Sequence, residues 1–164
     1  MKRLDNESSR KINYSADIAQ LEKYYQEQYE LIQSGNNDLA TLDLVMLGNA
    51  LDFIRFVRKT FDIKLCNDEQ SVSKLEEVLD ALNRGFLQEN FLDENNGNIA
   101  KKIGAYLGFL IIANIGGKWL DTENGEAVDV NGRIAYVCDF ALNRLKSGTE
   151  LNTITYYKSI KTVK

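Results

Sequence analysis

Apolar positions concentrate in one stretch of the chain, residues 103–115, where only two glycines and one asparagine interrupt them. A stretch this short is typical of a buried helix, because a membrane-spanning helix needs about 20 apolar residues. Ala100, Gly104 and Gly108 follow at four-residue steps, so one helix face is almost bare and another backbone can approach it closely. We therefore predict a central buried helix that ends at the glycine pair 116–117, since glycine suits the left-handed C-cap.

Apolar residues at helical spacing predict five further helices around this central one. They run approximately over residues 15–34, 41–59, 73–86, 136–146 and 151–160. The expected N-terminal caps are Ser15 for the first helix, Asp38 or Thr41 for the second, and Ser71 or Ser73 for the third. Gly48 lies inside the second helix and indicates a close packing contact there, because an internal glycine otherwise costs about 1 kcal/mol relative to alanine.

The connecting segments predict a small amount of β structure. Apolar and polar residues alternate over 61–66, which indicates a short strand or an extended connector, and DENNGN at 93–98 predicts a loop. Asn124-Gly125 predicts a β-hairpin that starts at Trp119. A second turn at Asn131-Gly132 leads either to a third strand over 133–137 or directly into a helix. The expected fold is α+β, mostly α, with a hairpin or three-stranded element near 118–137, a flexible segment 1–13 and one globular domain over 14–164.

The formal charge of −4 is distributed unevenly and disfavours nucleic acid as a partner. Residues 67–95 carry 2 basic and 8 acidic side chains, whereas residues 96–164 carry 9 basic and 6 acidic ones. On the third helix Glu76, Glu77 and Asp80 are expected to turn outward. They form either an ordinary solvated face or an acidic surface that meets a basic partner protein.

The residue inventory excludes several kinds of catalysis. The chain has no histidine, which removes Ser-His-Asp and Cys-His mechanisms, and its two cysteines, Cys66 and Cys138, cannot form a four-cysteine zinc site. DENNGN and DTENGE (121–126) resemble calcium loops only loosely, because glycine occupies position five rather than six. We predict no metal or cofactor. Free thiols and a polar N-terminus without an apolar h-region indicate a cytoplasmic protein, with no membrane association.

Trp119 is the only tryptophan, and an aromatic residue beside a tight turn is typical of a core plug. The alternative is a site around it for a small ligand or for carboxylate-based catalysis. Candidates for that site are Asp121, Glu123, Arg133, Asp139 and Arg144.

Three segments resemble a loose group of uncharacterised bacterial domains: SVSKLEEVLDAL at 71–82, GAYLGFLIIANIGGKW at 104–119 and NRLKSG at 143–148. The resemblance covers residues 71–157 and implies a glycine-spaced helix followed by a hairpin that starts at the tryptophan. The group often has an acidic residue where this chain has Phe109. Similar small bacterial domains occur as immunity proteins against secreted toxins.

These observations lead to three hypotheses. The first is a non-catalytic protein-binding domain of the immunity or inhibitor type. The second is the small-ligand or enzymatic site near Trp119. The third is a homo-oligomer that associates through exposed Tyr24, Tyr25 or Tyr29, because aromatic residues are enriched at interfaces.

Overall fold

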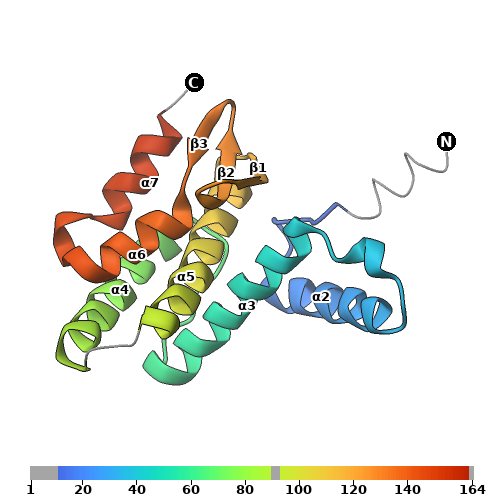
Figure 1. Cartoon of the computed structure of the whole chain (residues 1–164), viewed down its shortest axis with the longest axis horizontal. Coiled ribbons are helices and arrows are strands. Elements are labelled where there is room, and N and C mark those ends of the chain that lie inside the picture. Colours follow the sequence, from blue (N-terminus) through green and yellow to red (C-terminus); the bar gives the residue numbers. More distant parts are fainter. Residues whose placement is uncertain (1–10, 90–92, 163–164) are drawn as a thin grey trace.

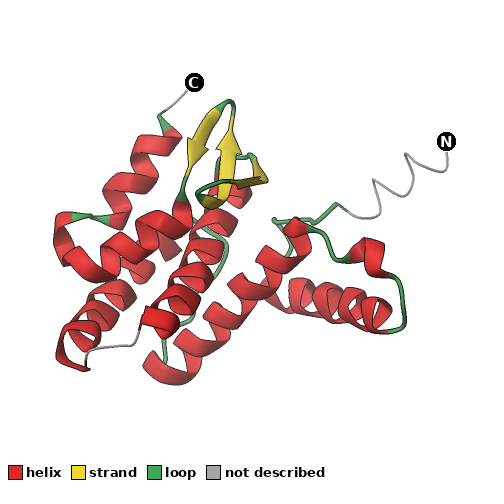
Figure 2. Ribbon diagram, in the orientation of Figure 1, coloured by secondary structure: helices red, strands yellow, loops and turns green. Residues whose placement is uncertain are grey.

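The computed structural model describes residues 11–89 and 93–162, which form six α-helices, two short 3-10 helices and one antiparallel sheet (Figure 2). The predicted α+β, mostly helical fold is confirmed. The elements are α2 (Ile18–Gln33), η1 (Asn37–Leu39), α3 (Leu42–Phe61), α4 (Gln70–Glu89), α5 (Asp93–Asn114), β1 (Lys118–Thr122), β2 (Gly125–Val130), β3 (Arg133–Ala135), α6 (Val137–Ser147), η2 (Gly148–Glu150) and α7 (Thr153–Lys161).

Helix α5 is central, as the apolar stretch predicted. It packs against α3 on one side and α6 on the other, and α4 and α7 lie beyond α6 (Figure 1). The small sheet covers the C-terminal end of α5, while α2 extends away from this body on the far side of α3 (Figure 1). No helix within the described part of the chain is long and apolar enough to cross a membrane.

The bare face of α5 allows the close approach that was predicted from its glycine spacing. A methyl group added at Gly104 would lie 2.6 Å from the Cα atom of Cys138, so the backbone of α6 occupies the space of a side chain. The remaining faces carry fully buried residues, among them Ile103, Leu107 and Tyr106, whose hydroxyl donates to the carbonyl of Cys66 at 2.6 Å. This packing fixes α6 against the core helix.

The glycine pair after α5 turns the chain back over the core. Gly116 and Gly117 have φ values of +112° and +122°, a region in which other residues are strained. Trp119 then folds back onto α5, where a methyl group at Gly108 would come within 2.3 Å of its indole ring. At 7% exposure, Trp119 is part of the core.

The sheet has the order β1-β2-β3 and two tight turns. Trp119 pairs with Val128, and the first turn closes at the pair Thr122 and Gly125. The second turn contains Asn131 (φ +53°) and Gly132 (φ +90°), the signature of a type I′ hairpin. Of the two continuations considered after this turn, the chain takes the third strand.

The first two helices begin and pack through local signals. Asp17, rather than the predicted Ser15, caps α2. The Asp17 side chain accepts a hydrogen bond from the backbone N–H of Gln20, and the Gln20 side chain accepts one from the backbone N–H of Asp17. Thr41 caps α3. The contact predicted at Gly48 is confirmed, since an added methyl group there would lie 2.6 Å from the hydroxyl of Tyr25 on α2.

The structure changes two sequence predictions and decides between the alternatives of a third. The segment 93–98 is not a loop, because α5 already begins at Asp93. Residues 63–66 form a connector without strand pairing, which is the second of the two alternatives predicted for 61–66, and Leu65 within it is buried. Of the predicted flexible segment, residues 1–10 lie outside the described part, whereas Ile12 is only 6% exposed and packs into the core.

Candidate functional site

The acidic helix α4 faces partly inward. The prediction that its acids turn outward is wrong for Glu76, which is 8% exposed, while Asp80 is half-buried and Glu77 is exposed. The reason is tertiary, because the side chain of Arg144 on α6 is fully buried against α4 and draws both carboxylates toward it.

Glu76 and Arg144 form a buried bidentate ion pair. Arg144 Nε donates to Glu76 Oε1 at 3.2 Å and Nη2 donates to Oε2 at 2.8 Å, while Nη2 also donates to Asp80. The Glu76 carboxylate further accepts from the backbone N–H of Thr153 at 3.0 Å and from the amide of Asn152 at 3.3 Å. These charges therefore join α4, α6 and the start of α7.

Burial by itself would lower the pKa of Arg144, but its hydrogen bonds to Glu76 and Asp80 outweigh this effect and raise it. The guanidinium is thus held charged inside the protein. Arg144 belongs to the framework of the fold, and it does not line the pocket described next, which contains Arg133.

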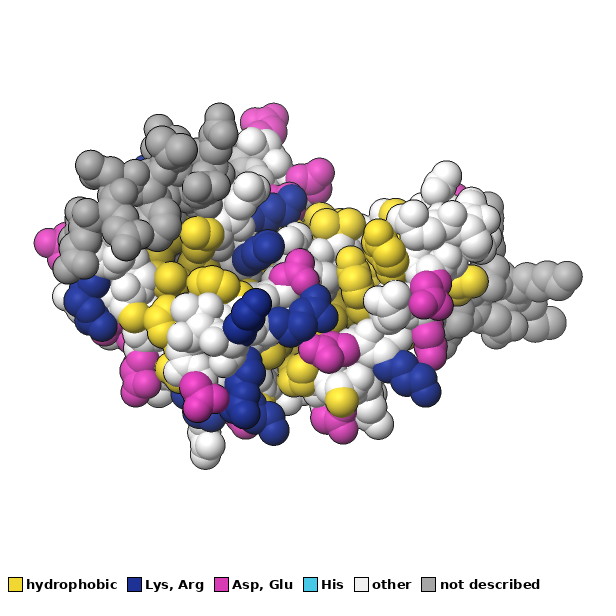
Figure 3. Space-filling view, turned by 90° about the horizontal axis from the view of Figure 1, so that it is seen from below, with side chains coloured by type: hydrophobic (Ala, Val, Ile, Leu, Met, Phe, Trp, Pro, Cys, Tyr) yellow, Lys and Arg dark blue, Asp and Glu magenta, His cyan; other side chains and the backbone are white. Residues whose placement is uncertain are grey.

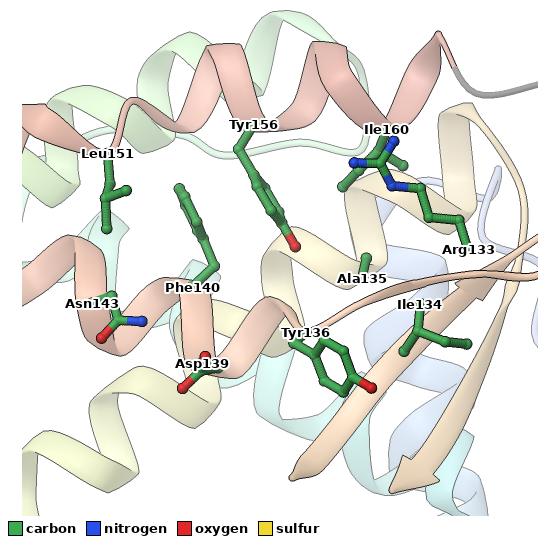
Figure 4. A pocket seen from close by; sticks show the side chains of 10 residues that line it. All are labelled: Arg133, Ile134, Ala135, Tyr136, Asp139, Phe140, Asn143, Leu151, Tyr156 and Ile160. Atoms are coloured by element: carbon green, nitrogen blue, oxygen red, sulfur yellow. The ribbon is translucent and has the colours of Figure 1, made fainter.

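An open pocket of about 290 Å³ lies between β3, α6 and α7. Its lining includes Arg133 and Asp139, two of the five residues that were predicted near Trp119. The rings of Phe140 and Tyr156 stack inside it with centroids 4.0 Å apart. Figure 4 shows Arg133 at one end of the lining and Asp139 well separated from it, with the hydroxyl of Tyr156 between them in this view.

The pocket combines an aromatic surface with separated charges. Arg133 donates to the backbone carbonyl of Ser159 at 3.3 Å. Burial raises the pKa of Tyr156 to about 12, with Arg133 lowering it and Asp139 raising it. A phenol with this pKa stays protonated at neutral pH, so it offers a hydrogen-bond donor rather than a base.

The other predicted members of this site lie elsewhere. Trp119 is buried over Gly108, and Asp121 and Glu123 are exposed on β1 and at the tip of the hairpin. The structure therefore does not assemble one site around Trp119. It brings Arg133 and Asp139 together at a pocket because β3 is followed immediately by α6.

The cysteines and the two loops considered as calcium sites show no such assembly. Cys66 and Cys138 are free thiols, and burial raises the pKa of Cys138 to about 12. DENNGN forms the first turns of α5, and DTENGE lies in the β1–β2 hairpin. Among residues 11–89 and 93–162, no three His, Cys, Asp or Glu side chains are placed to hold a metal ion.

A second surface, on α2 and α3, carries four of the exposed large apolar side chains. Tyr29 and Leu31 on α2 are 44% and 43% exposed, and Val45 and Phe56 on α3 are 43% and 40% exposed. Phe56 lies three turns from Val45, at positions that share a helix face. We define Tyr29, Val45 and Phe56 as the α2–α3 face.

Contacts between the two helices place Tyr29 and Val45 near the same end of the α2–α3 pair. Tyr25 lies opposite Gly48, and Glu22 Oε1 lies 4.0 Å from Arg55 Nη1, so α2 and α3 run antiparallel. Continuing this alignment brings Tyr29 level with Val45. The rings of Tyr25 and Tyr29 also stack, with centroids 6.3 Å apart.

Sequence reasoning identified Tyr29 as exposed. It assigned Val45 to the buried face of the second helix, which is wrong because Val45 is 43% exposed, and it did not single out Phe56. The other two tyrosines that were predicted to be exposed, Tyr24 and Tyr25, are half-buried. Comparison with protein-family models, curated proteins and solved structures finds no match to this chain.

Proposed function

We propose that this chain is a cytoplasmic, non-catalytic protein-binding domain of the inhibitor or immunity type, and that its partner binds the α2–α3 face. The observation that carries the proposal is the set of large apolar side chains left 40–44% exposed on these two adjacent helices. Exposed aromatic and aliphatic side chains gathered on one surface are typical of interaction sites.

The way α2 is attached supports a role outside the core. Leu21 is the only fully buried residue of this helix, and its other apolar contacts with the core are made by half-buried residues. Ordering a helix of this length costs conformational entropy, and packing on a partner would bury the ring of Tyr29 and add stabilisation. Figure 1 shows α2 projecting from the body of the molecule, where a partner can reach it.

The inventory of side chains agrees with binding rather than catalysis as the main role. The sequence has no histidine, and the buried charges of Glu76 and Arg144 are paired with each other. Residues 71–157 resemble small bacterial domains, some of which are immunity proteins, and the immunity role remains a prediction from that resemblance.

The test is affinity capture of the tagged protein from its own cells, with matched surface variants. The face variant combines Tyr29→Ser with Val45→Ser. The control variant is Leu120→Ser, at an apolar residue of β1 that is 36% exposed and lines neither the α2–α3 face nor the pocket between β3, α6 and α7. We expect one stoichiometric partner with the wild type and the control, and at least about tenfold less with the face variant.

Equal capture by all three proteins would contradict the proposal, as would equal loss in both variants. Circular dichroism melting checks that each variant is folded. A mass of two chains by light scattering, reduced to one by the face variant, would show instead that a second copy covers this face.

A second candidate function rests on the pocket between β3, α6 and α7. Its aromatic stack and the separated charges of Arg133 and Asp139 fit a small ligand that has both a ring and polar groups. Thermal-shift screening of a metabolite panel tests it. A compound that stabilises the wild type but not Arg133→Ala would support the candidate, and no response to any compound would remove it.

A further inference from the structure

An open groove of about 410 Å³ lies where the start of α2 meets the end of α3 and the connector that follows it. Its apolar part is formed by Ile18, Ile54 and Leu65. Its other lining residues are charged, and four of the five are basic: Glu22, Arg55, Arg58, Lys59 and Lys64. Figure 3 shows Lys and Arg side chains gathered next to hydrophobic ones on the underside of the molecule.

The basic side chains of this groove differ in how far they are neutralised. Arg55 pairs with Asp52 and approaches Glu22, and Arg58 Nη1 lies 3.6 Å from a carboxylate oxygen of Asp62. Within the described residues Lys59 and Lys64 have no ion-pair partner, and both are exposed.

A further cation stands beside the groove. Lys74 Nζ on α4 donates to the backbone carbonyl of Lys64 at 3.2 Å, which places its ammonium next to the connector. The groove thus has an uncompensated positive charge in a protein whose formal net charge is −4.

Stabilisation of α3 does not account for this charge. Basic residues in the last turn of a helix favour its dipole, and Arg58 and Lys59 occupy that turn of α3. Lys64 lies beyond the helix end, and Lys74 belongs to another helix. Their convergence on one groove with an apolar floor is a tertiary feature.

We infer that this groove binds an acidic segment of a partner polypeptide, with an apolar side chain of the segment on the half-buried Ile18 and flanking carboxylates at Lys59 and Lys64. The inference rests on the proposed protein-binding function and specifies the chemistry of the partner. We infer an acidic partner at the groove rather than the basic partner predicted from the acidic helix α4, because Glu76 is buried in the pair with Arg144. Charge complementarity of this kind gives both selectivity and a faster association rate.

The experiment is a fluorescence-anisotropy titration of the full chain with a defined probe. The probe is a fluorescein-labelled peptide with two adjacent leucines flanked on each side by three glutamates. Two matched peptides replace all glutamates by glutamine or both leucines by serine. The groove variant combines Lys59→Glu with Lys64→Glu, and the control variant combines Lys146→Glu with Lys158→Glu, two exposed lysines on α6 and α7.

We expect saturable binding of the probe to the wild type, weakened at least about tenfold in the groove variant and less than about twofold in the control, which has the same net charge. The glutamine and serine peptides should each bind more weakly than the probe, because they lack the charges or the apolar anchor. Higher salt should weaken the interaction.

Absence of saturable binding up to about 1 mM peptide would overturn the inference. So would equal loss in the groove and control variants, or tighter binding of inorganic phosphate or a single-stranded oligonucleotide. If the peptide fails while capture through the α2–α3 face succeeds, this inference fails and the proposed function stands. If the peptide binds while capture finds no partner, the groove is retained and the face proposal fails.

Discussion

Removal of the buried guanidinium of Arg144 should destabilise the protein strongly. In Arg144→Met the carboxylate of Glu76 loses two hydrogen bonds and its counter-charge. Water cannot fully replace them, because the Glu76 side chain is only 10% exposed. Breaking a buried ion pair on one side costs about 3–5 kcal/mol. Asp80, whose side chain is 35% exposed, can be solvated instead, so we expect a loss near the lower end, about 3 kcal/mol.

The assay is urea unfolding followed by circular dichroism and by the fluorescence of Trp119, which is buried in the native state. For a chain of 164 residues, a loss of about 3 kcal/mol corresponds to a fall in Tm of roughly 6–12 °C. The exposed arginine of the same region, Arg84 on α4, supplies the control. Arg84→Met should change stability by no more than about 0.5 kcal/mol.

A second substitution tests whether the uncompensated charge is the cause. Glu76→Gln should destabilise the wild type, because it weakens the pair with Arg144. In the Arg144→Met background the same change should stabilise, since it removes a buried charge and keeps an acceptor for the backbone N–H of Thr153. The reasoning is refuted if Glu76→Gln destabilises both backgrounds equally, or if Arg144→Met costs less than about 1 kcal/mol.

Two further predictions concern α5. Gly104→Ala should cost about 1–3 kcal/mol in urea unfolding despite the better helix propensity of alanine, because the new methyl group meets the Cα atom of Cys138 at 2.6 Å; a gain in stability would contradict the packing. Lys101→Met should cost at most about 1 kcal/mol at pH 7, because the ion pair with Glu126 is partly exposed. Burial alone would raise the pKa of Glu126, but its own backbone N–H and Lys101 lower it below the unfolded value. The stabilisation by this ion pair is therefore fully present above about pH 5 and disappears as the pH falls through the lowered pKa of Glu126. If Lys101→Met were still less stable than the wild type at low pH, this explanation would be contradicted.

Local patterns predicted the features of the fold that depend on short-range geometry. The four-residue spacing of Gly104 and Gly108 predicted a close approach, which the neighbouring Cys138 and Trp119 make. The Asn131-Gly132 turn was predicted because both residues tolerate positive φ. In each case the residues concerned are near in sequence or need only their own backbone conformation.

The loop predicted at 93–98 shows where such patterns fail. Its Asn and Gly residues favour turns, yet α5 begins at Asp93. Once the apolar face of α5 is packed, each added residue costs little, because a helix propagates more easily than it nucleates. Tertiary packing therefore overrides the weaker local preference.

By itself the sequence determined the central helix, the sheet and the absence of histidine chemistry, because these follow from periodicity, turn geometry and residue type. Only the tertiary structure decided how the charges are used. Glu76 and Arg144 are 68 residues apart and meet because α4 packs directly against α6. Lys59 and Lys64, in contrast, have no ion-pair partner among the residues that the structure describes. The physical reason is that a charge has the same identity in every conformation, but its hydration and its partners are fixed only when distant helices come together.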